Sequence, residues 1–253
     1  MRIYDTFLFG GELDMLETRL YELQDAPVYK HVIVEAATTF QGRHKGLVFP
    51  DHRERFASWK DRLRYVIADP GGGDAWAREA ASREETGKGL QDARAGDVII
   101  HGDVDEILTA AAIRRLGGIA GPVKFTQRCA VFAVDWLLPW PWTAPSAMRA
   151  GQVPSFTQLR MSGWADAGDG GWHLSWMGGP DAIDRKVNSF SHTEMLAEIT
   201  AGNQAGKYYE RGLFWGHGQG ETQLLAVDVD ETWPRWVHER KCPQVWFRPR
   251  GEL

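Results

Sequence analysis

Apolar residues in the first half of the chain follow two alternating spacings. Leu13, Leu16, Leu20 and Leu23 recur at helical intervals and predict an amphipathic helix over residues 12–23. Short apolar runs rich in β-branched residues predict buried strands at residues 3–9, 31–35, 63–68 and 97–102. Further helices are expected at residues 74–90 and 109–116. This alternation indicates an α/β fold with a mostly parallel central sheet flanked by helices.

The second half of the chain has a different pattern. Residues 123–136 and 156–162 are expected to form strands, and residues 165–171 a loop rich in glycine and aspartate. Helices are expected at residues 180–188 and 192–200. Because no repeat or low-complexity linker divides the 253 residues, we expect a single domain over residues 1–253.

Charge and composition narrow the classes of partner. The net charge of −5 argues against a general attraction for nucleic-acid backbones. No signal peptide and no apolar run of about 18 residues is visible, so we expect no transmembrane segment and a cytoplasmic location. Cys129 and Cys242 match no zinc or redox spacing and are interpreted as reduced structural thiols.

Asp103 and Asp105 form the sharpest local signal, because they directly follow the apolar run of residues 98–100. Alternate residues of an extended segment point the same way, and ligands bind beyond the carboxyl ends of strands in parallel sheets. The pair therefore predicts a site for Mg²⁺ or Mn²⁺ that bridges a nucleotide diphosphate. Phosphatases with an aspartyl nucleophile share this motif, but they place it after the first strand and follow it with Thr or Val, whereas here Ile107 follows. A solvated acidic turn is the structural alternative.

Several basic side chains are candidates for contact with metal or phosphate. His173 lies between tryptophans after the acidic loop, and His192 is a second candidate ligand. Lys186 and Arg78 are candidate phosphate contacts. Core packing of the histidines and solvated helix positions for Lys186 and Arg78 are the alternatives.

Tryptophan is abundant, with 12 residues in the chain. We expect most of them to pack in the core. The segment from Trp136 to Trp142 is stiffened by Pro139 and Pro141. Rigid aromatic faces suit sugar rings, so Trp140 and Trp142 are proposed to line an acceptor wall, with core packing as the alternative.

Together these motifs resemble glycosyltransferase family 17, whose best-known members add the bisecting N-acetylglucosamine to N-glycans. The matching segments occur in family order over roughly the first 195 residues. They are IYDTFLF (3–9), ELDMLETRL (12–20), VIVEA (32–36), WARE (76–79), GDVDEI (102–107), GWHLS (171–175), Lys186 and SFSHTE (189–194).

The resemblance implies a GT-A type fold with a nucleotide-sugar half at about 1–120 and an acceptor-side half at about 121–253. It implies a metal-dependent, inverting transfer of a sugar, with N-acetylglucosamine and a UDP-sugar donor favoured. Asp103 and Asp105 correspond to its metal motif, with His173 as the third protein ligand. Substrate-binding roles are implied for Glu35, Arg78, Trp172, Lys186 and His192.

The acceptor and the catalytic base are less constrained. The chain departs from animal members of the family in having no visible membrane anchor or stem, so we expect a glycan acceptor other than an N-glycan. An inverting transfer needs a carboxylate base. Asp169 is our choice, because it lies in the loop before Trp172, while Asp166, Glu194 and Glu221 stay open. The alternative function is a non-catalytic carbohydrate-binding protein with an aromatic glycan platform.

Overall fold

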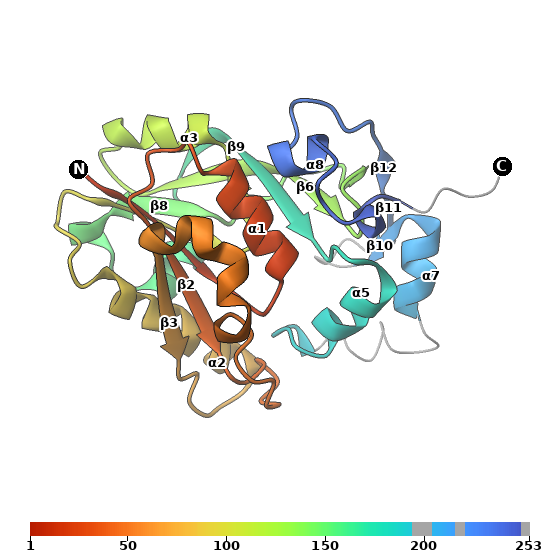
Figure 1. Cartoon of the computed structure of the whole chain (residues 1–253), viewed down its shortest axis with the longest axis horizontal. Helices are drawn as coiled ribbons and strands as arrows, with labels where there is room; N and C mark the ends of the chain where they lie inside the picture. The colour runs from red at the N-terminus through yellow and green to blue at the C-terminus, as the bar shows by residue number, and fades with distance from the viewer. Residues whose placement is uncertain (194–203, 216–220, 249–253) are drawn as a thin grey trace.

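The computed structural model describes residues 1–193, 204–215 and 221–248 (Figure 1). Its first half contains the predicted parallel strands. They are β1 (Ile3–Leu8), β2 (Lys30–Ala36), β3 (Leu63–Ala68) and β4 (Val98–Asp103). Their order is β3-β2-β1-β4, and every neighbouring pair is parallel. β1 is buried along its whole length, as its apolar sequence predicts.

The sheet continues into the second half with mixed directions. β8 (Ser146–Arg149) pairs antiparallel with β4 and with β6 (Val123–Val131), and β6 is followed by β7 (Trp136–Leu137) and β12 (Leu225–Ala226). β9 (Ala165–Ser175) runs parallel to β6 and antiparallel to β5 (Glu106–Leu108). A separate pair joins β10 (Leu213–Trp215) to β11 (Glu221–Gln223). The predicted α/β class is confirmed, and the parallel arrangement is concentrated in the first half.

Helices cover the sheet and connect its strands (Figure 1). They are α1 (Leu13–Glu22), α2 (Ala75–Glu84), α3 (Ala110–Arg115), α4 (Phe156–Met161), α5 (Gly179–Val187), α7 (Gln204–Arg211) and α8 (Arg235–His238). Segments of 3-10 helix include η1 (Pro50–Arg62), which is kinked at Phe56, and η2 (Glu85–Leu90). The helix expected over residues 74–90 therefore changes type after residue 84. Side-chain caps begin α2 at Asp74 and α3 at Thr109, where each side chain accepts a backbone N–H.

A buried arginine fixes α1 to the sheet edge that carries the acidic motif. Arg19 is 1 % exposed and pairs with Asp5 of β1 through both Nε and Nη2. Its Nη1 donates to the carbonyl oxygens of Asp103 and Glu106 at 3.1 and 2.8 Å. Nδ1 of His31 on β2 lies 2.8 Å from Oδ2 of Asp5, the oxygen that also accepts from Nε of Arg19. The guanidinium of Arg19 therefore fixes the backbone of the turn after β4.

Two sequence expectations for the second half are wrong. Residues 156–161 form α4 instead of a strand, because Ser155 caps the segment and Phe156, Leu159 and Arg160 share one buried face. Residues 165–171 begin β9 instead of forming a loop, because pairing with β6 provides partners for their backbone. The helix expected at residues 192–200 lies mostly outside the described residues.

Candidate active site

The acidic motif lies where the strand order of the parallel sheet reverses. β1 connects through α1 to β2 on one side, whereas β4 lies on the other side of β1. In open α/β sheets, ligands bind in the crevice beyond the strands at such a switch point. Acidic residues flank it here, with Glu12 after β1 and Asp103, Asp105 and Glu106 at and beyond the end of β4.

Asp103 is held between two buried arginines. Its Oδ1 lies 2.9 Å from Nη1 of Arg83, and its Oδ2 lies 2.8 Å from Nη2 of Arg160. Burial alone would raise the pKa of Asp103, but the charges of Arg160 and Arg83 outweigh it and hold that pKa below its ordinary range. Both oxygens of this carboxylate lie next to protein cations, but only Oδ2 accepts hydrogen bonds from them, and Oδ1 has no hydrogen-bond partner among the described residues.

Glu106 extends this network beneath the motif. Its side chain is fully buried, and Oε2 accepts from the Asp103 backbone N–H at 2.9 Å and from Arg160 at 2.5 Å. Oε1 accepts from the indole N–H of Trp142 at 2.5 Å. A Cβ at Gly102 would lie 2.6 Å from Oε2, so only glycine allows Glu106 to fold back in this way. The network of Asp103, Glu106, Arg83 and Arg160 forms a rigid floor.

Asp105 has different partners, which come from the second half of the chain. Its Oδ2 lies 3.0 Å from Nζ of Lys186 on α5 and 3.5 Å from Nε2 of His173 on β9. Burial alone would raise the pKa of Asp105, but Lys186 and His173 outweigh it and lower that pKa. We call Asp105, His173 and Lys186 the Asp105 cluster.

His173 is oriented on three sides. Besides Asp105, its Nδ1 lies 3.5 Å from Sγ of Cys129, and its ring packs against Trp142 with centroids 4.6 Å apart. Burial lowers the pKa of His173, but Asp105 and Cys129 outweigh it and raise that pKa to about 10. The imidazole is therefore positively charged at neutral pH. Cys129 and Cys242 are both buried free thiols, as their spacing predicts.

Three predicted substrate contacts have structural surroundings instead. Glu35 is fully buried and accepts from Lys45, from the backbone of Val48 and Phe49, and from the Tyr65 hydroxyl. Arg78 donates to the Phe40 carbonyl at 2.9 Å. Trp172 is buried beneath Arg128, whose guanidinium lies 5.7 Å from the ring centroid. Glu35 and Arg78 fix the loop over residues 37–49, and the described contacts place none of the three in the Asp105 cluster.

His192 lies near the network of Asp103, Glu106, Arg83 and Arg160, on the side of Glu79. Its ring meets Trp76 edge-on, with centroids 4.5 Å apart, and also packs near Phe190. The neighbouring Ser191 donates to Glu79, which pairs with Arg83 at 2.6 Å. These contacts connect α2 to the segment after α5, so His192 borders the site without touching Asp105 in the described contacts.

A register shift between β6 and β9 separates Asp169 from His173. Parallel partners share a sheet face, and Asp169 is paired with Thr126 while His173 is paired with Cys129. Because residues 126 and 129 point to opposite faces, Asp169 faces away from the Asp105 cluster. Gly171 permits the shift, with φ of +125° and no room for a Cβ beside the Ile107 carbonyl. The structure thus does not support Asp169 as a base acting at Asp105.

Two of the three other carboxylates considered for the base also have partners outside the Asp105 cluster. Asp166 precedes the shift and accepts from Thr126 and from the backbone of Gly168. Glu221 accepts from the Tyr208 hydroxyl. Glu194 lies outside the described residues.

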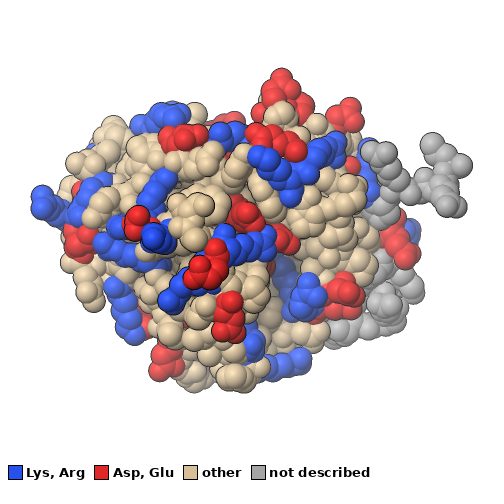
Figure 2. All heavy atoms as spheres, in the orientation of Figure 1, with Lys and Arg blue, Asp and Glu red and all other residues tan. Residues whose placement is uncertain are grey.

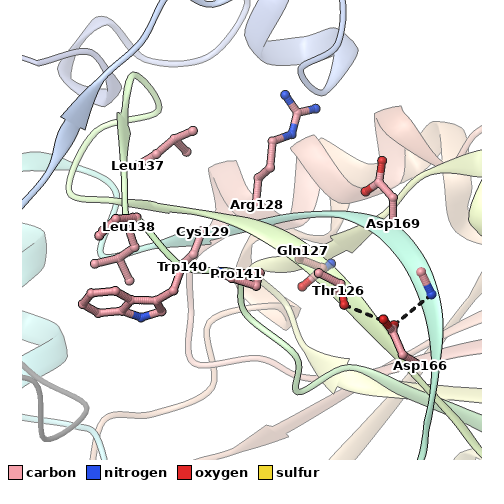
Figure 3. Close-up of a pocket in the computed structure, with 12 residues that line it drawn as sticks. Thr126, Gln127, Arg128, Cys129, Leu137, Leu138, Trp140, Pro141, Asp166 and Asp169 are labelled. Atoms are coloured by element: carbon pink, nitrogen blue, oxygen red, sulfur yellow. Dashed lines mark hydrogen bonds between the residues drawn. The ribbon is translucent and has the colours of Figure 1, made fainter.

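The tryptophan segment divides into core and surface. Trp136 is 8 % exposed and packs against Tyr209. Trp140 and Trp142 are half-buried. Trp142 touches the site through Glu106 and His173, whereas Trp140 borders a separate cavity between β6 and residues 137–141 (Figure 3).

Arg83, Arg160 and Glu106 are the site residues that sequence reasoning missed. The Glu79–Arg83 pair at helical spacing was a visible local signal. Arg160 showed no such local signal. Its segment was expected to be a strand, and its partners Asp103 and Glu106 lie more than 50 positions away in the sequence.

Surface charge is mixed on the face shown in Figure 2, where described basic and acidic groups alternate over the first half of the chain. Within the described ranges, no three His, Cys, Asp or Glu side chains gather to hold a metal ion. No helix in those same ranges is long and apolar enough to cross a membrane.

Comparisons with known proteins identify the family. The model of glycosyltransferase family 17 matches residues 1–206. A search of curated proteins found no match. Among solved structures, the chain is 13 % identical to 2-C-methyl-D-erythritol 4-phosphate cytidylyltransferase from Francisella tularensis, over 60 % of this chain and 74 % of that one, with a TM-score of 0.35.

A second solved structure is the homologue of Mycobacterium tuberculosis rv0371c from Mycobacterium sp. strain JC1. It is 13 % identical over 79 % of this chain and 99 % of that one, with a TM-score of 0.41. Neither likeness bears on function. The family match covers most of the chain, includes both segments that flank the switch point, and identifies the protein as a glycosyltransferase, a member of glycosyltransferase family 17.

Proposed function

We propose that this glycosyltransferase takes a sugar from a nucleoside-diphosphate donor at the Asp105 cluster and transfers it to a carbohydrate acceptor. The observation that carries the proposal is the convergence of Asp105, His173 and Lys186 from three elements at the switch point of the sheet. A carboxylate, an imidazole and an ammonium group at that position suit the diphosphate of a donor and its counter-cation.

Lys186 is the proposed phosphate contact. Its ammonium group is partly exposed and is held by Asp105 with the Ser175 hydroxyl 3.5 Å away. An ammonium group can contact phosphate oxygens as a point charge and stabilise the charge that builds up on the leaving diphosphate. Arg83 and Arg160 lie behind Asp103 and are neutralised by Glu79, Asp103 and Glu106. Of these three cations, Lys186 is therefore the one that remains available to the diphosphate.

The residues present fit a divalent cation, Mn²⁺ or Mg²⁺, only in part. Asp105 Oδ2 and His173 Nε2 are 3.5 Å apart, a separation that two ligands of one ion can have. Asp103 stays a candidate through Oδ1, which lies 2.9 Å from Arg83 but makes no hydrogen bond within the described residues, whereas its Oδ2 is held by Arg160. Asp105 and His173 would hold the ion, and His173 would have to release its proton. When bound, the ion would neutralise the diphosphate.

Glu12 is the proposed general base for an inverting transfer. It follows β1 at the switch point, and burial together with the charge of Asp105 raises its pKa, while Lys186 opposes this rise. Oε2 accepts only from the Gly10 backbone among its described hydrogen bonds. A carboxylate with free acceptor capacity beyond the end of β1 can take the proton of an acceptor hydroxyl.

The donor favoured by family membership is UDP-N-acetylglucosamine. The test is a thermal-shift screen of nucleotide sugars with and without Mn²⁺, followed by an assay of nucleotide release. Donor binding with slow release of UDP supports the proposal. Glycan binding with no binding of any nucleotide sugar would support the non-catalytic alternative instead.

A further inference from the structure

Three neighbouring strands bring a row of side chains to one face of the sheet beside the Asp105 cluster. Glu106 of β5 is directly opposite His173 of β9, and His173 is directly opposite Cys129 of β6. Cross-strand partners share a face, so these three buried side chains point to the same side of the sheet. We call Glu106, His173 and Cys129 the cross-strand row. It connects the rigid floor, through Glu106, to the Asp105 cluster, through His173.

Trp142 lies over the cross-strand row, and its backbone fixes it there. It forms an antiparallel bridge with Gln127 of β6, with N–H···O distances of 2.8 and 2.9 Å in the two directions. Gln127 and Cys129 are two positions apart on β6, so the partner of Gln127 presents its side chain to the face of the row. Gln127 is fixed in turn, because its side-chain amide donates to the Ile107 carbonyl at 3.0 Å. The indole therefore lies on the row through backbone pairing as well as through its own contacts.

The indole contacts two neighbours in the row at once. Its Nε1–H donates to Oε1 of Glu106 at 2.5 Å, and its ring packs against the imidazole of His173 at a tilt of 33°, with centroids 4.6 Å apart. The other oxygen of Glu106 accepts from Arg160 and from the Asp103 backbone, so this carboxylate is itself held in place. The ring that packs on His173 is thus fixed both at its backbone and at its N–H.

These contacts restrict the orientation of the His173 imidazole. With the Trp142 ring packed against it, its Nδ1 lies 3.5 Å from Sγ of Cys129 and its Nε2 lies 3.5 Å from Oδ2 of Asp105. Rotation about the Cβ–Cγ bond would lose both polar contacts and the ring packing. This torsion is broad in an unrestrained histidine, so its neighbours and not the side chain itself set the orientation.

We propose that Trp142 is a positioning residue for the donor site, and that it holds His173 with Nε2 directed at Asp105 before the donor binds. The proposal rests on the proposed function, in which the Asp105 cluster binds the donor diphosphate. It gives Trp142 a role other than contact with an acceptor. An imidazole fixed in advance need not be ordered when the donor binds, and ordering one side chain lowers affinity by about two- to tenfold.

The test is a double-mutant cycle on UDP affinity, measured by isothermal titration with Mn²⁺ for the wild type, W142L, H173Q and W142L/H173Q. Because Trp142 acts through His173, W142L should weaken UDP binding roughly fivefold in the wild-type background and by no more than about twofold in the H173Q background. W142F keeps a ring against the imidazole and should retain most of the affinity.

Two further variants complete the cycle. W59L makes the same exchange at a half-buried tryptophan of η1 that packs against the core, and it should bind UDP like the wild type. If W142L does not fold, W142M takes its place, because a flexible methionine fills more of the space that the indole leaves.

NMR spectra of the protein with ¹³C-labelled histidine rings, recorded without UDP or Mn²⁺, report on the imidazole itself. H173Q identifies the His173 signal among those of the 8 histidines. We expect a single sharp His173 signal in the wild type and in W142F, and a broadened or doubled signal in W142L.

The two measurements separate this inference from the proposed function. Equal loss of UDP affinity from W142L in both backgrounds, unchanged affinity in W142L, or a single sharp His173 signal in W142L would overturn the role of Trp142 and leave the donor site in place. No UDP binding by the wild type would overturn the proposed function, and the spectra would still decide whether Trp142 holds His173.

Discussion

Nζ of Lys186 lies 3.0 Å from Oδ2 of Asp105, although 81 positions separate the two residues. This contact joins α5 to the carboxyl end of β4, so the two halves of the chain meet at the proposed donor site. Burial lowers the pKa of Lys186, but Asp105 outweighs it and raises that pKa, so the ammonium group stays charged.

Replacing Lys186 by Ala should weaken UDP binding by roughly tenfold, because charge-assisted hydrogen bonds contribute about 1.5–3 kcal/mol and part of this contact is exposed to solvent. Isothermal titration of UDP measures the loss. Arg185→Ala is the matched control, since Arg185 is the exposed neighbour on the same helix. Equal weakening in both variants would point to a general change in surface charge.

Asp103 and Asp105 should differ in what they contribute. Asp103→Ala leaves Arg83 and Arg160 without their shared carboxylate, and we expect a loss of about 2–3 kcal/mol in the free energy of unfolding. Asp105→Ala leaves Lys186 and His173 without their carboxylate and should impair donor binding more than Asp103→Ala does. Urea unfolding measures the stability of both variants, and UDP titration measures their donor affinity. A larger loss of UDP affinity in Asp103→Ala than in Asp105→Ala would contradict these roles.

Glu12→Gln should lower kcat at least tenfold and leave the dissociation constant of UDP within about twofold, because a general base contributes 10²- to 10⁴-fold and the amide keeps the shape of the side chain. Steady-state kinetics with the donor and a glycan acceptor measure both values. Unchanged kcat would remove Glu12 from the mechanism. Glu17→Gln, an exchange on the outer face of α1 where Glu17 pairs with Arg55, is the control.

Acid should destabilise the fold through the buried group of Asp5, Arg19 and His31. Burial lowers the pKa of His31, so its neutral form stabilises the fold above about pH 6.5 and this contribution is lost as the pH falls. Burial would raise the pKa of Asp5, but Arg19 and His31 outweigh it and lower that pKa. The ionised Asp5 carboxylate therefore stabilises the fold above about pH 4, and this stabilisation is lost as the pH falls further.

Urea midpoints measured from pH 8 to pH 5 should therefore fall toward acid, and His31→Gln should flatten the slope between pH 7 and pH 5. A slope that stays as steep in His31→Gln would assign the acid sensitivity to other groups.

The sequence predicts the first half of the fold well, because its strands are continuous apolar runs that lie at the centre of a parallel sheet. Asp103 and Asp105 could be found because they directly follow such a run. The pattern of residues 156–162 predicts a strand, because the six-residue helix that forms there contains too few turns to show a helical period.

The partners within the site could not be predicted from local patterns. Arg160 and Lys186 reach the motif only through the packing of α4 and α5, and the face of Asp169 depends on a one-residue register shift at Gly171. A shift of this size reverses which side chains share a face, and no periodicity in the segment signals it.

The most direct test is the titration of UDP in the presence of Mn²⁺ against wild type, Asp105→Asn and Asp184→Asn. The asparagine keeps the size of Asp105 but removes its charge, while Asp184 is an exposed carboxylate on the same helix as Lys186. We expect the wild type and Asp184→Asn to bind UDP alike, and Asp105→Asn to lose at least tenfold in affinity. Equal affinity of all three proteins would contradict the assignment of the Asp105 cluster as the donor site.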